Sequence, residues 1–301
     1  MRYNKANDLL LKKEGVTMIS IGLTGWSDHD LLTVRKSKRL EDYSSHFPFV
    51  ELDTSFYAIP PDKNIFSWIE KTPATFQFIP KAFQAMTLHK DWLKFFPTEQ
   101  QMFEHYIAIF EPMITAHRIK TFLFQFPPYF DCTKEHVQYL RKVRQYMGEL
   151  PIAIEFRHSS WYSDTNKENT LAFLTEEQFI HTVVDQPQTP GNSVPLTVKG
   201  TNDELTLFRL HGQNYEGWLD ASGPNWREKR TLYDYSSSEL DDFVTIIRQL
   251  ETESKEVAVI FNNNSGGHAA KNAKQLQKKL QLTFDHLAPQ QTELNLFEED
   301  F

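Results

Sequence analysis

The residues best suited to chemistry stand in pairs at the ends of short apolar runs. Glu51 and Asp53, Glu155 and Arg157, and Arg209 and His211 are each two positions apart. Side chains two apart on a strand share a face, so each pair points to one side of its strand. Other apolar runs also end in polar residues: Lys81, Gln125, His158, Asp185, Asn262 and Asn263. Such carboxylates, imidazoles and cations predict proton transfer on an anionic substrate.

The residue types divide this set into two groups of predicted roles. We expect acid–base work from the carboxylates and histidines Glu51, Glu155, His158 and His211. We expect orientation and neutralisation of an anion from Lys81, Gln125, Arg157, Asp185, Arg209, Asn262, Asn263 and His268. An alternative stays open, in which Glu155, Arg157 and Arg209 form an ion-pair network and Glu51 caps it.

The segment from Asn262 to His268 is the predicted phosphate site. Two glycines, Gly266 and Gly267, let the backbone approach a ligand, and a helix predicted to start near Ala269 presents free N–H groups. A tight turn with an Asn or Ser cap explains the same residues equally well.

Aromatic residues and metal donors give two further hypotheses. Aromatic side chains that follow apolar runs stack on a sugar or base, or else anchor loops: Trp26, Tyr57, Trp161 and Trp218. Donors for a divalent metal are Glu51, Asp53, Glu155 and His211, although no local metal-binding spacing such as His-Glu-x-x-His supports them. The cofactor is therefore left unknown.

Eight apolar runs have to position these residues. Each has about five to seven residues rich in Ile, Val and Phe, which is typical of buried parallel strands: 18–23, 49–53, 76–81, 121–126, 152–156, 179–185, 205–211 and 257–262. Helical spacing follows several of them, with starts at Pro61-Asp62, Thr98, Thr133, Ser236 and Ala269.

This alternation predicts a single TIM-type (β/α)8 parallel barrel. Such a barrel needs about 250 residues and carries its active site where the carboxyl ends of the strands meet. A doubly wound open sheet is the runner-up, but Gly22-Leu-Thr-Gly25 matches a dinucleotide-binding turn poorly, so no nucleotide cofactor is indicated. We divide the chain into a leader segment (1–17), the barrel (18–288) and an acidic, flexible C-terminal tail (289–301).

Composition narrows the class of protein. The 301 residues carry a net charge of −8, so the overall field does not attract nucleic acid, although a local basic site would. The single cysteine, Cys132, excludes an internal disulfide and fits a reducing compartment. Residues 1–17 lack the features of a secretory signal, and no apolar run is long enough to span a bilayer. We expect a cytoplasmic protein with no membrane contact.

Ordered motifs resemble a known family. Gly25-Trp-Ser27, Glu51 to Tyr57, Phe124 to Pro128, Glu155-Phe-Arg-His158, Arg209-Leu-His-Gly212 and Phe261-Asn-Asn263 occur in sequence, and together they resemble the domain of unknown function 72 family over about 18–283. The chain departs from that pattern at Asp53, where Asn is more usual, and in an extra Asn-Ser-Gly at 264–266. The resemblance implies a TIM-type barrel and supplies no reaction.

The acidic end contains Leu294, Leu296 and Phe297. This pattern resembles the short peptides by which bacterial repair and replication proteins bind the sliding clamp, although Glu293 stands where Gln is expected. Packing of these three residues onto the barrel is the alternative.

The leading hypothesis is a hydrolase or lyase of a phosphorylated or phosphodiester-containing substrate, either a small sugar phosphate or damaged nucleic acid. A non-catalytic ligand-binding module recruited to a partner by its tail is the rival. A sugar isomerase or glycosidase that uses Glu51 and Glu155 is the third alternative.

Overall fold

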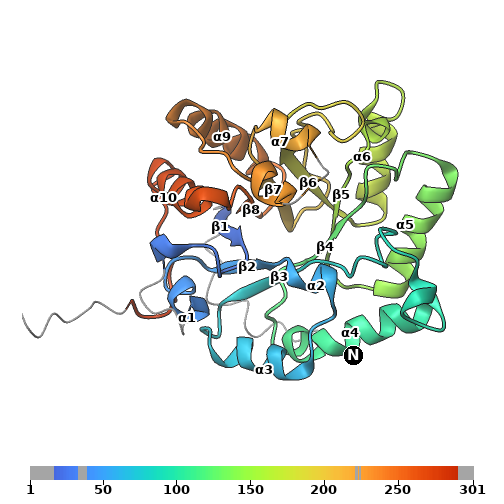
Figure 1. Cartoon of the computed structure of the whole chain (residues 1–301), viewed down its shortest axis with the longest axis horizontal. Helices are drawn as coiled ribbons and strands as arrows, with labels where there is room; N and C mark the ends of the chain where they lie inside the picture. The colour runs from blue at the N-terminus through green and yellow to red at the C-terminus, as the bar shows by residue number, and fades with distance from the viewer. Residues whose placement is uncertain (1–16, 33–38, 221–222, 224, 291–301) are drawn as a thin grey trace, which may run out of the picture.

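The computed structural model describes residues 17–32, 39–220, 223 and 225–290. Eight parallel strands run through it, in the order β3-β2-β1-β8-β7-β6-β5-β4. They are β1 (Met18–Thr24), β2 (Phe49–Leu52), β3 (Gln77–Pro80), β4 (Phe122–Gln125), β5 (Ile152–Glu155), β6 (Ile180–Asp185), β7 (Leu205–Leu210) and β8 (Glu256–Phe261). Figure 1 shows the strands in the centre with helices around them. The predicted eight strands are confirmed to within one or two residues at their ends.

The ring closes between β3 and β4. Isolated parallel bridges join Phe78 to Ile119 and Lys81 to Leu123. The Ala82 N–H also donates to the Leu123 carbonyl at 2.9 Å. At the opposite side, β1 pairs with β8 over six residues. The sheet is therefore a barrel, as the sequence predicted, and not an open doubly wound sheet.

Side chains fill the barrel. One buried cluster draws members from most strands: Phe49, Ile79, Leu123, Ala153, Ile180, Leu205, Leu207, Ala258 and Ile260. Gly22 is required where β1 meets Phe49, because a Cβ at this position would lie 2.5 Å from the Phe49 ring. The interior is thus a packed core, and ligands can be bound only at its ends.

Of the main outer helices, the sequence predicted all except the one that begins at Lys167, and the predicted starts hold to within one residue. These helices are α3 (Asp62–Glu70), α4 (Glu99–Thr115), α5 (Lys134–Met147), α6 (Lys167–Glu176), α9 (Ser237–Leu250) and α10 (His268–Lys279). The Thr98 and Thr133 hydroxyls cap α4 and α5, and Ser236 with Glu239 forms a capping box on α9. Within the described ranges, no helix combines the length and apolar character that crossing a bilayer requires.

Short helices and 3-10 turns fill the remaining connections. They are η2 (Asp30–Leu32), α1 (Arg39–Tyr43), α2 (Thr54–Tyr57), η3 (Trp92–Lys94), η4 (Ser159–Tyr162), α7 (Tyr215–Leu219), α8 (Trp226–Arg230) and η5 (Ser265–Gly267). The connection from β6 to β7, residues 186–204, contains no helix. Pro187, Pro190 and Pro195 each remove a helix donor there, which explains why this segment departs from strict strand–helix alternation.

Candidate functional site

A buried arginine joins two strand ends at the mouth of the barrel. Arg209 on β7 donates from Nε and Nη2 to the two carboxylate oxygens of Glu51, at 2.9 and 2.8 Å. Its Nη1 also donates to Glu155 at the end of β5. All three side chains are at most 1% exposed. This group, Glu51–Arg209–Glu155, is the floor of the mouth. It matches the ion-pair alternative in joining Arg209 to Glu155, and it differs because Glu51 is part of the pairing and Arg157 is not.

His211 extends the floor. Its Nε2 lies 2.9 Å from Oε1 of Glu155, and the Asn262 amide lies 2.9 Å from its Nδ1. This pattern fits a neutral imidazole that donates from Nε2 and accepts at Nδ1. Burial lowers the pKa of His211 to about 3, although Glu155 opposes the shift. His211 is therefore neutral at pH 7.

The two floor carboxyl groups differ in acidity. Burial raises the pKa of Glu51 above its ordinary value, and Arg209 only partly offsets this effect. Burial also acts to raise the pKa of Glu155, but Arg209 and His211 outweigh it and hold that pKa well below the ordinary value. Two carboxyl groups with diverging pKa values are typical of functional sites.

Above the floor lies a polar group that solvent can reach. The Lys81 ammonium is 2.9 Å from Oδ1 of Asp53 and 3.3 Å from Oε1 of Gln125. The Gln125 amide in turn donates to Glu155, which links this group to the floor. The Asp53 side chain is 35% exposed. Burial acts to raise the pKa of Asp53, but Lys81 outweighs it and lowers that pKa below its ordinary value. Asp53 is thus an accessible carboxylate beside a cation.

Arg157 is a buried cation at the mouth, and none of the carboxylates that the structure describes pairs with it. It follows β5 on the same face as Glu155 and is 5% exposed. Its Nη2 donates to Oδ1 of Asn192 at 3.0 Å, whereas its Nε has no hydrogen-bond partner. Burial and the nearby Arg230 hold the pKa of Arg157 well below its ordinary value. An anion at this position would relieve both unfavourable effects.

The donor set does not fit a metal. Within the described residues, no three His, Cys, Asp or Glu side chains are arranged to hold an ion. The guanidinium of Arg209 stands between Glu51 and Glu155, where a shared ion would have to sit.

Comparison with known proteins places the chain in a family. The family model described as protein of unknown function DUF72 matches residues 20–295. The chain belongs to the DUF72 family. It is 47% identical over 281 residues to the UPF0759 protein YunF of Bacillus subtilis, a match that covers 92% of this chain and all of that protein. The UPF0759 protein YecE of Escherichia coli is 29% identical over about half of each chain.

Solved structures of DUF72 family proteins share the barrel. One from Enterococcus faecalis superimposes with a TM-score of 0.86 at 43% identity, covering 92% of this chain and all of the other. One from Thermotoga maritima gives a TM-score of 0.75 at 32% identity, covering 88% of this chain and all of the other. The predicted resemblance to the DUF72 family is confirmed. These relatives carry no stated activity in their names.

Several predicted site residues of this DUF72 protein lie away from the floor. His158 accepts the Ser160 N–H as the N-cap of η4. Trp161 is 1% exposed, stacks on Phe156 at 4.0 Å and donates to a backbone carbonyl, so it anchors a loop and cannot stack on a ligand. Trp26 packs edge-on against Trp68. His158 lies away from the floor because side chains alternate between the two faces of a strand, and His158 is an odd number of positions from Glu155 and Arg157.

Other predicted residues have structural partners. Asn263 points away from Asn262 and donates to the Tyr233 carbonyl and to Asn272. The nearest acidic group to His268 is Asp234, at 3.7 Å. The Asp185 carboxylate accepts the Tyr235 hydroxyl and the Gln213 amide, both at 2.6 Å. No ligand contact is needed to explain these positions, although the paired glycines before α10 both have positive φ, as a close turn requires.

Sequence reasoning missed Arg230. It lies at the end of α8, and its Cζ is 3.8 Å from the ring centre of Trp218. The sequence signal for it is weak, because a cluster of basic residues such as Arg227, Lys229 and Arg230 is typical of a solvated helix face.

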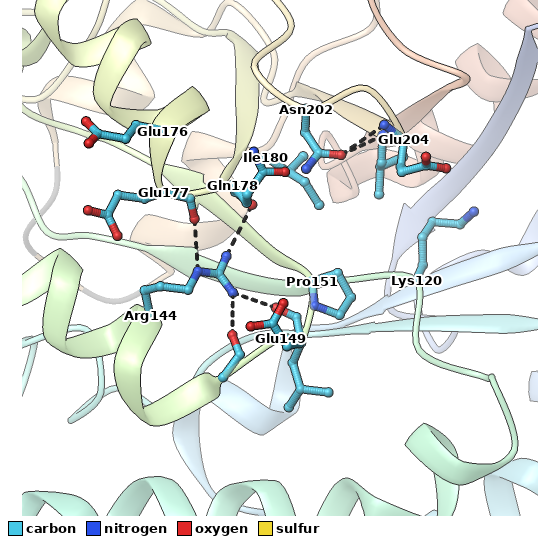
Figure 2. Close-up of a pocket in the computed structure, with 13 residues that line it drawn as sticks. Lys120, Arg144, Glu149, Pro151, Glu176, Glu177, Gln178, Ile180, Asn202 and Glu204 are labelled. Carbon is cyan, nitrogen blue, oxygen red and sulfur yellow. Dashed lines mark hydrogen bonds between the residues drawn. The ribbon is translucent and has the colours of Figure 1, made fainter. Parts of the chain in front are cut away.

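A separate cavity of about 440 Å³ lies at the opposite end of the barrel. Figure 2 shows Arg144 there with dashed lines to backbone oxygens. Its guanidinium donates to the carbonyls of Gly148, Leu150, Glu177 and Gln178. These bonds tie the ends of α5 and α6 together, so we interpret Arg144 as structural.

Proposed function

We propose that this DUF72 protein is an enzyme, a hydrolase or lyase, that acts on a phosphorylated or phosphodiester-containing substrate at the mouth of the barrel. The observation that carries this proposal is Arg157, a buried guanidinium at a strand end with no carboxylate partner among the described residues. Arg presents a planar set of donors that matches phosphate oxygens, and burial strengthens such a contact.

In this proposal, the role of each side chain follows from how far solvent can reach it. Asp53 would accept a proton from the attacking water as the water oxygen bonds to phosphorus. The leaving-group oxygen would depart with the electron pair of the broken phosphorus–oxygen bond and take a proton from solvent. Lys81 and Arg157 would neutralise the oxygens of the phosphoryl group, because charge stabilisation dominates this chemistry. The floor keeps fixed charges beneath the substrate. Glu51, Glu155 and His211, predicted as direct acids or bases, act in this proposal by orienting and polarising the groups above them.

The complete pairing of the floor residues with one another favours a second candidate function, a non-catalytic binding module. Arg209, Glu51 and Glu155 satisfy one another without a ligand, which is what a non-catalytic binding module requires. A glycosidase finds no support, because Arg209 occupies the space between the two carboxylates.

The test uses chromogenic esters with the full chain. Wild-type protein is incubated with p-nitrophenyl phosphate and with bis(p-nitrophenyl) phosphate, and release of nitrophenol is followed. We expect Asp53→Asn to slow release by about a hundredfold. Asp241→Asn is the matched control, since Asp241 also pairs with a lysine, Lys279 at 2.6 Å, but far out on α9. It should leave the rate unchanged.

Two results would contradict this proposal, the first by rejecting the enzyme and the second by rejecting the role of Asp53. Ligand binding without turnover by wild-type protein supports the binding module. Equal loss in Asp53→Asn and Asp241→Asn removes Asp53 from the mechanism.

The tail residues Leu294, Leu296 and Phe297 lie outside the described residues. Binding of the sliding clamp through them is a separate proposal. A chain ending at Gln290 should lose clamp binding while keeping its activity at the mouth. Clamp binding that survives this truncation would contradict it.

A further inference from the structure

Two arginines share one aromatic ring beside the floor. Trp218 on α7 is 2% exposed and lies edge-on to His211, with ring centres 5.8 Å apart. The Cζ atoms of Arg157 and Arg230 lie 4.4 and 3.8 Å from the Trp218 ring centre. Trp218 therefore brings the cation that follows β5 and the cation that ends α8 to a single place.

No described carboxylate pairs with either arginine. Arg157 binds only Asn192, and its Nε is unpartnered. The Arg230 side chain has no hydrogen bond or ion pair with any residue in the described ranges, and burial lowers its pKa to about 10. Glu155, the nearby anion, is already bound by Arg209, His211 and Gln125. Two like charges, a buried Arg157 and a partly buried Arg230, thus lie close together without an ion-pair partner among the described residues, which is unfavourable unless a ligand supplies one.

The two positive charges of Arg157 and Arg230 indicate which class of phosphate ligand fits. A phosphate monoester carries nearly two negative charges at pH 7 and three acceptor oxygens, enough for two guanidinium groups. A phosphodiester carries one charge and two free oxygens, so one guanidinium would stay uncompensated. A long polyanion is further disfavoured by the net charge of −8.

We propose that Arg157 and Arg230, held on Trp218, bind the dianionic phosphate of a small phosphomonoester. This inference rests on the proposed function and refines it, because that function left monoester and diester substrates open. Arg230 is a specificity-determining residue in this proposal, and the short helix α8 positions it.

The test uses ligands that the enzyme cannot hydrolyse. Phenylphosphonate, studied at an alkaline pH where it is a dianion, stands for the monoester. Methylphenylphosphinate, a monoanion with two free oxygens and no ester bond, stands for the diester. Calorimetric titration of the full chain should show the dianion binding at least about tenfold more tightly. Arg230→Gln should abolish this preference by weakening the dianion alone. Arg248→Gln removes an exposed arginine paired with Glu251 and should change nothing.

The outcomes separate the two proposals. Equal affinity for both ligands, or an equal loss for both in Arg230→Gln, overturns the dianion assignment and leaves the proposed function standing. If neither ligand binds, both the dianion assignment and the proposed function are overturned. Arg157→Lys keeps the charge but loses the planar donor set, so it should weaken dianion binding with an unchanged melting temperature. Unchanged dianion binding in this variant would also contradict the assignment.

Discussion

Replacing Arg209 tests the buried floor most directly. Arg209→Gln leaves the carboxylates of Glu51 and Glu155 fully buried without their shared cation. Removing one partner of a buried ion pair costs about 3–5 kcal/mol, because the charge that remains cannot be solvated. We expect a loss of this size in the free energy of unfolding, measured by urea denaturation at neutral pH.

Two further measurements sharpen this prediction. The double variant Glu51→Gln/Arg209→Gln removes one orphaned carboxylate and should recover on the order of 2 kcal/mol over Arg209→Gln. The deficit of Arg209→Gln should also shrink as the pH falls from 7 to 5. Without the cation, the folded-state pKa of both carboxyl groups rises, so the folded variant takes up protons that relieve the repulsion.

A loss below about 1 kcal/mol would refute the reasoning, because that is the value of an exposed pair. Arg248→Gln, which breaks the exposed contact with Glu251, provides this reference in the same assay. A double variant less stable than Arg209→Gln would also contradict the picture of an uncompensated buried charge.

Three other predictions concern stability. His211 and His181 are buried with pKa values of about 3 and 4. Because the unfolded histidines bind protons below about pH 6.5, stability should fall as pH drops from 7 to 5, by about 2 kcal/mol for each histidine; a urea midpoint that does not move would contradict this. Trp161→Ala should cost about 3–5 kcal/mol in the same assay, as loss of a core anchor, and an effect typical of a surface site would return Trp161 to the mouth. His158→Ala should cost about 1 kcal/mol as a lost N-cap and leave phenylphosphonate affinity intact; weakened affinity would restore His158 to the site.

Much of the fold can be read from local pattern. Runs of Ile, Val and Phe predict buried strands, and Thr98, Thr133 and Ser236 mark helix starts, because both signals depend on neighbours in sequence. Period-two alternation also predicts correctly that Glu155 with Arg157, and Arg209 with His211, share a face. By the same alternation, His158 directly follows Arg157 and therefore points to the other face, away from the mouth.

The tertiary structure alone decides which of these side chains meet. Arg209 lies 158 positions from Glu51 and 54 from Glu155, and only closure of the barrel sets one guanidinium between both carboxylates. Arg157 and Arg230 are likewise far apart in the sequence, and Trp218 brings them together. Alternation along a strand specifies a direction and says nothing about the partner across the barrel. Which charges are compensated is therefore a property of the closed barrel.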